Sequence, residues 1–375
     1  MARSSAGSGK ASAAHPESLR QMPLFKNYAD VRDWVLRLKS ADVPAATQPA
    51  YGRAQSASLD CMLDASPLLL QRLRLHGSHL TGHKIDDYRF RRRDRVAAFA
   101  AKIAMLESAC GGRELFVPEA PELGGFGFEI NGALVNIDTL KFWEVMIALE
   151  KAAVLEDLRK APSKDRGMPC RIVWEIGASW GGFARVFKTI LPHVSFVIVD
   201  FPETMLFSAL YLKHVFPQAR FHFHEPGGSD PHWTEDFVFF AHADLKGMQP
   251  PRLDLALSVA SFEEMTRKDM GGYVETAWNL GAPYLYSLNR ERSLDNPQPD
   301  SVSDVLSRCF WPHEIPVLEI PHTHLPEPDT EHRAAKPRDK GRNTREDKVK
   351  GEGDEGKPEP GNGYRHIIGW RKTET

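Results

Sequence analysis

Residues 173–182 read Val-Trp-Glu-Ile-Gly-Ala-Ser-Trp-Gly-Gly, a β-type run that leads into a glycine-rich turn. Glycines in such a turn let the backbone approach a ligand closely, because they carry no Cβ. The next residues place apolar side chains at i, i+3, i+4, i+7 and i+8, which is typical of a helix that packs one face on a sheet. These are Phe183, Val186, Phe187, Ile190 and Leu191. The segment therefore predicts a strand, a ligand-binding turn and a helix in succession.

The chain from residue 166 onward alternates β-type runs with amphipathic helices, the pattern of an α/β protein. Such alternation predicts a mostly parallel, Rossmann-like sheet with helices on both faces. The expected strands cover 172–176, 196–200, 253–260 and 283–288, and the expected helices cover 183–191, 204–216 and 267–280. The third strand is either 221–224 or 237–241, and the pattern does not choose between them.

The last part of the chain predicts an antiparallel C-terminal hairpin. Its two strands are expected at 315–320 and 364–370, and the residues between them, at about 324–362, are dense in Pro, Gly, Lys, Asp and Glu. A segment this polar buries too little apolar surface to offset its ordering entropy. We therefore expect a disordered, charged insertion at the tip of the hairpin.

The N-terminal part of the chain has a different texture. Residues 1–22 are rich in Ala, Ser and Gly and predict a disordered tail, whereas 23–165 carry apolar residues at mainly helical spacing. Asn131-Gly132 interrupts this pattern between two short apolar runs and predicts a two-residue hairpin. Asp138 is the expected N-cap of the helix that follows. The predicted organisation is a tail, a helical cap domain at 23–165 and a Rossmann-like domain at 166–375.

Composition narrows the classes of partner. The formal net charge of the 375 residues is -2, which argues against nucleic acid and favours a small-molecule or neutral substrate. The one dense basic run, 90–95, is interpreted as a solvated helix face. The four cysteines are widely scattered, as expected of a cytoplasmic protein, and no run approaches the roughly 18 apolar residues of a membrane span. Association into a homo-oligomer is left open.

Two acidic residues indicate the kind of ligand that the glycine turn holds. Glu175 lies at the end of the first strand, where its charge would oppose the phosphates of a dinucleotide, and Ser179 replaces the second glycine of the dinucleotide motif. A carboxylate there instead favours S-adenosylmethionine, whose sulfonium and ammonium groups are positive. Asp200, at the tip of the next strand, is placed to accept hydrogen bonds from ribose hydroxyls.

Other chemistries remain open at this stage. Residues 177–181 also fit the GxSxG nucleophile elbow, which would make Ser179 a hydrolase nucleophile with Asp254 and His366 as candidate partners. A third alternative is a module that binds S-adenosylmethionine without catalysis. His222 and His224 would share one face of a strand, but satisfied histidines are the commoner explanation, so no metal is predicted.

Several blocks of the sequence resemble the sugar O-methyltransferases, a branch of the class I S-adenosylmethionine-dependent methyltransferases. The matching blocks are 123–126, 131–132, 135–140, 175–182, 198–204, 261–265 and 286–290. The chain departs from the family pattern at Ser179 and Trp180, where GAGYGG is usual, at Glu263, where glutamine is usual, and in the charged insertion. The resemblance implies a class I methyltransferase sheet, S-adenosyl-L-methionine as cofactor and a hydroxyl of a sugar or glycan as acceptor.

These considerations assign candidate roles to individual residues. Ligands in open α/β sheets lie beyond the carboxyl ends of the strands, where Glu264 is the first choice for the catalytic base and Glu263 the second. Asn289 and Arg290, at another strand end, are the candidate acceptor-binding residues. The candidate cofactor-binding residues are Glu175, Gly177, Ala178, Ser179, Gly181, Asp200, Phe201 and Ser261.

Overall fold

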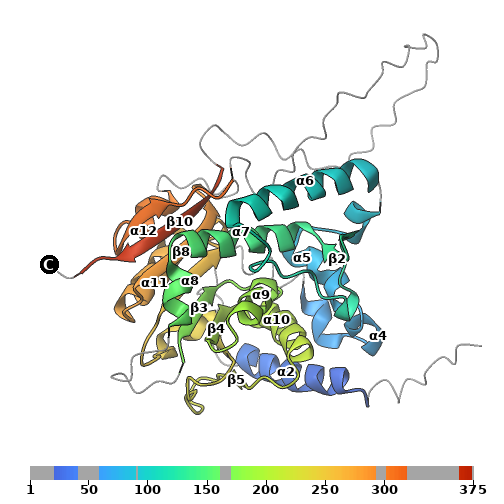
Figure 1. Ribbon diagram of the computed structural model, residues 1–375. Helices are drawn as coiled ribbons and strands as arrows, with labels where there is room; N and C mark the ends of the chain where they lie inside the picture. The colour runs from blue at the N-terminus through green and yellow to red at the C-terminus, as the bar shows by residue number, and fades with distance from the viewer. Residues whose placement is uncertain are drawn as a thin grey trace, which may run out of the picture.

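A mixed sheet forms the centre of the molecule in the computed structural model, which describes residues 21–40, 59–89, 92–160, 170–292, 301–318 and 363–373 (Figure 1). Within these residues the sheet has eight strands in the order β5-β6-β4-β3-β7-β8-β10-β9. The strands are β3 (Ile172–Ile176), β4 (Ser195–Asp200), β5 (Phe221–Phe223), β6 (Phe237–Ala241), β7 (Leu255–Val259), β8 (Tyr284–Arg290), β9 (Phe310–Glu314) and β10 (Tyr364–Arg371). The expected insertion at 324–362 and residues 1–20 of the expected tail lie outside the described residues.

The direction of the strands confirms the predicted sheet. Neighbouring strands pair in parallel from β5 through β8, and β10 pairs antiparallel with both β8 and β9. The chain proceeds outward from β3 to β4 and β6 on one side, and from β7 to β8 on the other. The strand order therefore reverses between β3 and β7, and such a switch point is where open α/β sheets bind ligands. This is an α/β, Rossmann-like fold with an antiparallel C-terminal strand.

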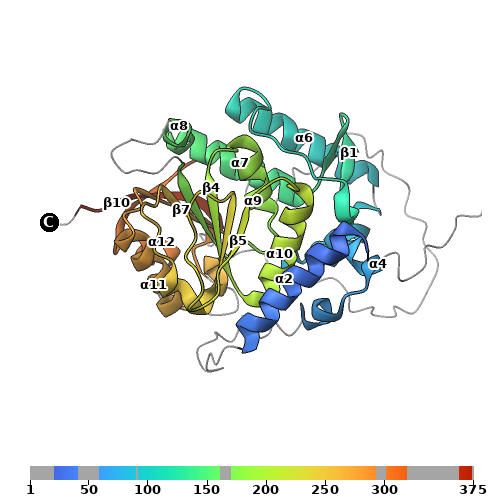
Figure 2. The ribbon, with the colours of Figure 1, turned by 90° about the horizontal axis from the view of Figure 1, so that it is seen from below.

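Helices cover both faces of the sheet, as Figure 2 shows from below. On one face α11 (Arg267–Asn279) and α12 (Val302–Leu306) pack on a core that includes Trp174 and Val199. On the other face α9 (Gly182–Ile190) and α10 (Pro202–Val215) pack on Val173 and Ile198. Alternate residues of each buried strand thus enter opposite cores, as the two-residue period of a strand requires.

The N-terminal helices share the second of these cores. Buried residues such as Trp34 and Trp143 belong to the same hydrophobic cluster as Val173, so the cap region packs directly on one face of the sheet. Its helices are α2 (Pro23–Ser40), α4 (Pro67–Leu70), α5 (Ser78–Thr81), α6 (Arg92–Cys110), α7 (Ile137–Lys151) and α8 (Val154–Arg159). Short 3-10 segments lie at Asp60–Asp64, Leu73–Gly77, Ile85–Tyr88, Glu122–Gly124, His242–Gly247 and Phe262–Glu264.

Two local expectations are corrected, and one choice that the sequence left open is decided. The predicted hairpin forms, as β1 (Phe128–Ile130) and β2 (Ala133–Val135), but the N-cap of α7 is Asn136 rather than Asp138, because the Asn136 side chain accepts a hydrogen bond from Thr139 N. Both candidates for the third strand are strands, since β5 adds to the outer edge of β6.

The hairpin strand expected at 315–320 is also wrong where the structure describes it. Strand β9 is Phe310–Glu314, and residues 315–318 follow it without strand structure. Ile315 and Val317 are apolar because they are buried in the core beneath, which the sequence pattern alone does not distinguish from strand pairing. None of the helices in the described part of the chain combines the length and the hydropathy that a membrane-spanning segment needs.

Candidate functional site

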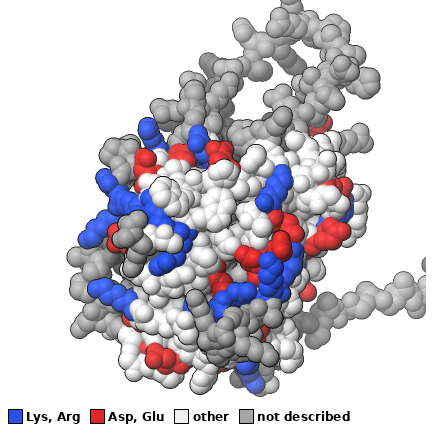
Figure 3. Space-filling model, turned by 60° about the vertical axis from the view of Figure 1, so that its left-hand side comes forward, with Lys and Arg blue, Asp and Glu red and all other residues white. Residues whose placement is uncertain are grey.

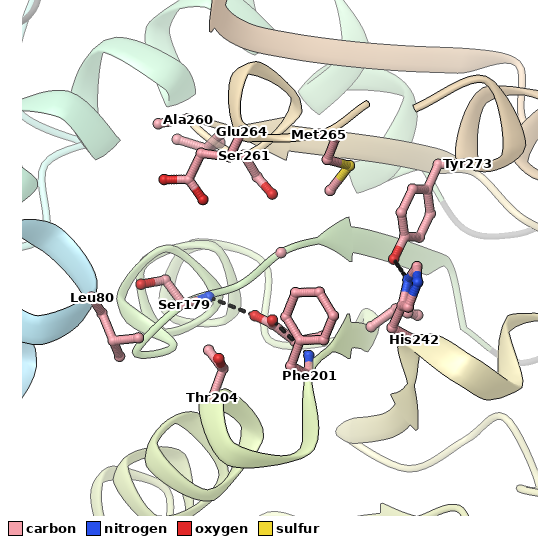
Figure 4. A pocket seen from close by; sticks show the side chains of 14 residues that line it. Leu80, Ser179, Phe201, Thr204, His242, Ala260, Ser261, Glu264, Met265 and Tyr273 are labelled. Atoms are coloured by element: carbon pink, nitrogen blue, oxygen red, sulfur yellow. Dashed lines mark hydrogen bonds between the residues drawn. The ribbon is translucent and has the colours of Figure 1, made fainter. Parts of the chain in front are cut away.

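Two adjoining cavities open at the carboxyl ends of the central strands, where the switch point predicts a ligand. The first, which we name the turn cavity, has a volume of about 530 Å³ with its open mouth included, and is drawn in Figure 4. The second, the cap cavity, has a volume of about 910 Å³ measured in the same way. Five residues line both cavities, so the two lie side by side: Leu80, Ser179, Val259, Ala260 and Glu264.

Five of the eight predicted cofactor-binding residues line the turn cavity. They are Gly177, Ser179, Asp200, Phe201 and Ser261, and they come from the turn after β3, the end of β4 and the loop after β7. The other three, Glu175, Ala178 and Gly181, are not among the described residues that line either cavity. The predicted residues therefore lie at the strand ends that border the turn cavity, but three of them do not line it.

The turn after β3 needs left-handed backbone at three residues. Gly177 has φ +75°, and a Cβ there would overlap Ser261 Oγ, so only glycine is accommodated without movement. Gly181, with φ +84°, precedes α9 in the same conformation. Ser179 has φ +54°, a conformation that costs a non-glycine residue roughly 1–2 kcal/mol. The backbone at Ser179 thus has the left-handed conformation that glycine adopts most easily.

Asp200 holds the turn of β3 and the turn of β4 together. Its Oδ2 accepts a hydrogen bond from Ser179 N (3.0 Å), and its Oδ1 accepts one from Phe201 N (2.8 Å). Burial raises the pKa of this carboxyl to about 7, although the backbone N–H groups of Phe201, Ser179 and Ala178 oppose the rise. Each carboxylate oxygen has two lone pairs, so both can still accept a hydrogen bond from a ligand in the cavity.

Glu175 lies behind the turn and is 2% exposed. Burial raises its pKa well above the ordinary value for glutamate, and the nearby Asp200 charge raises it further, while Lys141 lowers it. Its Oε2 has no hydrogen-bond partner among the described residues. Within that part of the chain neither Glu175 nor Asp200 forms an ion pair. Two buried acids next to one cavity therefore have no ion-pair partner among the described residues, and Lys141 acts on Glu175 only from a distance.

Glu263 and Glu264, the two candidate bases, have different surroundings. Glu263 Oε1 accepts a hydrogen bond from the Tyr364 hydroxyl (2.6 Å), and its Oε2 accepts one from Arg290 N (2.9 Å). Both oxygens thereby tie the loop after β7 to β8 and β10. Glu264 is exposed and lines both cavities at their junction. Of the two, only Glu264 lines both cavities, whereas Glu263 lines the cap cavity alone.

The two candidate acceptor-binding residues also differ. Arg290 lines the cap cavity, where its guanidinium stacks on the Tyr364 ring at 4.8 Å from the centroid. Asn289 is 2% exposed and lines neither cavity. Its Oδ1 accepts hydrogen bonds from Ser261 N (2.8 Å) and Phe262 N (2.9 Å), and its Nδ2 donates to Ser287 Oγ (2.8 Å). The side chain thus holds Ser261 in place above Gly177.

The residues proposed for a serine hydrolase are not assembled into a triad. Asp254 binds Ile172 N (2.9 Å) and Arg171 (2.8 Å) at the amino end of β3, whereas Ser179 follows the carboxyl end of that strand. His366 donates to or accepts from the Tyr286 hydroxyl (2.7 Å) on β8. Neither Asp254 nor His366 lines a cavity with Ser179. This geometry contradicts a nucleophile elbow in which Asp254 and His366 are the partners of Ser179.

Several lining residues were missed by sequence reasoning. Thr204, His242, Met265 and Tyr273 line the turn cavity, where His242 Nδ1 and the Tyr273 hydroxyl are hydrogen-bonded (Figure 4). Thr204 and Met265 are the last residues of two blocks that resemble the family, and His242 directly follows β6. Their positions shortly after strand ends were the signal that could have identified them. Leu80, Thr81 and His83 come from the cap and carry no local signal, because only tertiary packing brings them to the site.

The other sequence features give no site in the described part of the chain. His224 binds Asp244 (2.9 Å) and stacks on Phe240, and no group of three metal-ligating side chains occurs among the described residues. Of the basic run, residues 90–91 lie outside the described residues. On the face drawn in Figure 3, Lys and Arg side chains are interspersed with Asp and Glu rather than forming one basic field.

Solved structures with a similar fold include several methyltransferases. The pyocyanin biosynthetic protein PhzM is 12% identical, over 54% of this chain and 50% of that one, with a TM-score of 0.31. An O-methyltransferase family protein from Burkholderia thailandensis is 13% identical, over 64% and 60%, with a TM-score of 0.32. The N-methyltransferase NodS from Bradyrhizobium japonicum is 11% identical, over 54% and 86%, with a TM-score of 0.31.

The comparisons assign neither a family nor a substrate. No protein-family model and no curated protein matches the chain. The chain spans only about half the length of the first of the solved structures that it resembles. The likeness to these structures is limited to part of the fold.

Proposed function

We propose that the chain is an S-adenosyl-L-methionine-dependent O-methyltransferase. The observation that carries the proposal is the pair of buried acids, Glu175 and Asp200, at the end of a glycine turn and without an ion-pair partner in the described part of the chain. An uncompensated buried carboxylate is costly, and a positively charged ligand removes that cost. S-adenosylmethionine carries positive charge on its sulfur and its amino group.

The turn cavity also suits such a cofactor in its chemistry. Gly177 leaves the floor of the cavity free of a Cβ, and Asp200 retains lone pairs for the hydroxyls of a ribose. Phe201 and Met265 supply apolar surface for a flat ring. Glu175 lies behind the turn, and a cation bound in the cavity would stabilise its ionised form and be attracted by it without contact.

The cap cavity is the proposed acceptor site. It is lined by charged and polar side chains such as His83, Lys141, Arg290 and Tyr364, which suit an acceptor rich in hydroxyl groups. The resemblance to sugar O-methyltransferases favours a sugar or glycan hydroxyl as the acceptor. The two cavities share Ser179, Ala260 and Glu264 in their lining, and this adjacency supports transfer from one to the other.

The bound cofactor would supply an electrophilic methyl group. The protein has to align the acceptor oxygen with it, exclude water and accept a proton. Glu264, at the junction of the cavities, is the proposed proton acceptor. Asn289 holds the loop that carries Ser261, and Glu263 holds the end of β8 that carries Arg290, so we now assign positioning roles to both Asn289 and Glu263.

The test of this mechanism is the Glu264→Gln variant. Loss of the base should lower turnover by about 10²–10⁴-fold, measured with labelled S-adenosylmethionine on a panel of free sugars, nucleotide sugars and polysaccharides. Affinity for S-adenosylhomocysteine should stay within about twofold, because Glu264 lies outside the acidic pair that binds the cofactor. Wild-type turnover in this variant would remove Glu264 from the mechanism.

One outcome separates catalysis from binding alone. Tight binding of S-adenosylhomocysteine by the wild-type protein, with no methyl transfer to any acceptor of the panel, would favour the non-catalytic binding module. A Ser179→Ala variant that keeps full methyl transfer would dispose of the remaining hydrolase alternative, since a hydrolase loses its nucleophile in that change.

A further inference from the structure

Arg74 is a buried cation of the cap that contacts the glycine-rich turn after β3. We call this turn, residues 177–182, the cofactor turn. It lies in the 3-10 segment Leu73–Gly77 and is 0% exposed. The central carbon of its guanidinium lies 3.4 Å from the ring centroid of Trp180, the residue at the middle of the glycine turn. This is stacking distance, and the contact is shielded from water, so it is at the strong end of cation–π interactions.

The guanidinium is held in one orientation by the cap itself. Its Nε donates to Glu119 Oε1 (2.9 Å), and its Nη2 lies 3.3 Å from Glu119 Oε2. Asn136 Nδ2 donates to the same Oε2 (2.8 Å), and Asn136 is also the N-cap of α7. A planar fork bound at two points has little freedom to turn. The face that Arg74 presents to Trp180 is therefore fixed by residues of the cap.

The Trp180 ring also folds back over the beginning of α9. A Cβ on Gly182 would overlap the indole ring, so glycine at that position is required by the ring that covers it. The edge of the ring also packs on Tyr211 of α10, with centroids 5.0 Å apart. The ring is thus enclosed by Arg74, Gly182 and Tyr211. The same segment of cap then continues to Leu80 and His83, which line the cap cavity.

We propose that Arg74 is a positioning residue that clamps the cofactor turn to the cap through Trp180. The clamp fixes the strained backbone at Ser179 and makes the turn cavity and the cap cavity parts of one rigid unit. Tryptophan at residue 180, a departure from the family pattern, is the side chain that receives the cation. The effect on cofactor affinity rests on the proposed function, whereas the effect on the turn itself does not.

The experiment compares Arg74→Met with Lys102→Met. Lys102 is a matched control, because it is also a fully buried cation of the cap, paired with Glu144 (2.8 Å). Amide hydrogen exchange would be followed at Gly177, Ser179 and Gly181, whose N–H groups all donate hydrogen bonds. We expect exchange at these amides to speed up at least tenfold in Arg74→Met and to change less than twofold in Lys102→Met.

Cofactor affinity is the second measurement on the same proteins. Calorimetric titration with S-adenosylhomocysteine should give a Kd at least tenfold weaker for Arg74→Met than for Lys102→Met. Arg74→Lys keeps the charge but loses the planar fork, so we expect an intermediate value from it. Should Arg74→Met fail to fold, Arg74→Lys and Trp180→Leu provide the same comparison.

Two results would overturn the clamp. One is unchanged exchange at the three turn amides in both Arg74 variants, and the other is an equal change in the Lys102 control. Absence of binding by the wild-type protein would instead refute the proposed function, and the exchange measurement would still decide whether Arg74 holds the turn.

Discussion

The two ends of the central strands treat their acidic residues in opposite ways. At the amino end of β3, Asp254 binds Arg171 (2.8 Å), Arg252 and the backbone N–H of Ile172 (2.9 Å). At the carboxyl end, Glu175 and Asp200 are equally buried and have no ion-pair partner among the described residues. The acids at the two ends belong to the same sheet, and they differ in whether arginine side chains pair with them.

This difference separates a structural acid from a binding acid. A carboxylate between two arginines stabilises the fold. Removing the carboxylate would leave both guanidinium groups without this partner. A buried acid pair without cations costs stability until a ligand arrives, and such uncompensated groups are concentrated at functional sites. The amino end is therefore interpreted as part of the framework, and the carboxyl end as the place where a cation is bound.

The largest expected effects come from changing one acid at each end. Asp254→Asn should lower the free energy of unfolding by about 3–5 kcal/mol, because it leaves two guanidinium groups without their partner. Asp200→Asn should weaken S-adenosylhomocysteine binding by roughly 30–100-fold, through loss of a charge-assisted hydrogen bond. Denaturant unfolding and calorimetric titration of both variants check this. A similar loss of stability in the two would contradict the division between the ends.

Glu175→Gln should sharpen the comparison, because it removes charge from the binding end alone. Burial raises the pKa of Glu175, so the acid form is favoured in the folded state, and its contribution to stability is lost as the pH rises through that raised value. The variant without cofactor should therefore unfold at a higher temperature than wild type at pH 8, and the difference should shrink toward pH 5. Cofactor affinity should fall about tenfold. A lower melting temperature at pH 8 would show that Glu175 is neutralised after all.

The pH dependence of binding tests Asp200 without a mutation. Its pKa is raised to about 7 in the protein without ligand, and the cofactor needs the ionised form as acceptor. The fraction of competent protein then falls below pH 7, so the Kd should rise about tenfold between pH 8 and pH 6. Calorimetry at several pH values measures this rise, and a flat profile across that range would exclude Asp200 from binding.

Ser179→Gly should have the smallest effect. Glycine removes the cost of left-handed backbone at φ +54°, partly offset by the greater freedom of the unfolded chain. We expect a gain of roughly 0.5–1 kcal/mol in the free energy of unfolding and a change of less than twofold in cofactor affinity. A destabilised variant would mean that the Ser179 hydroxyl, which has no hydrogen-bond partner in the described residues, nonetheless contributes to the turn.

Local pattern was sufficient for the parts of the site that follow a strand directly. Gly177, Asp200 and Ser261 could be placed because a β-type run, a turn residue and a helical pattern occur together in sequence. The same reasoning placed strand β9 too late, at Ile315, because burial under the sheet and pairing within it both select apolar residues. It also assigned acceptor contact to Asn289, which is buried and fully hydrogen-bonded to its neighbours.

The contribution of the cap could not be predicted from the sequence. Arg74 lies more than a hundred residues before Trp180, and no periodicity or motif links the two. Leu80, Thr81 and His83 reach the cavities only because the N-terminal helices share a core with one face of the sheet. Local patterns report local structure, whereas a site built from distant segments depends on packing that a single sequence does not reveal.

The central claim is that the carboxyl end of β3 and β4 binds a positively charged adenosyl cofactor. Calorimetric titration of the purified wild-type protein with S-adenosylmethionine at pH 8 tests it most directly, with Asp254→Asn and Asp200→Asn titrated alongside. We predict one-site binding in wild type and in any folded Asp254→Asn, and a loss of at least 30-fold in Asp200→Asn. Absence of binding in wild type, or equal affinity in wild type and Asp200→Asn, would contradict the claim.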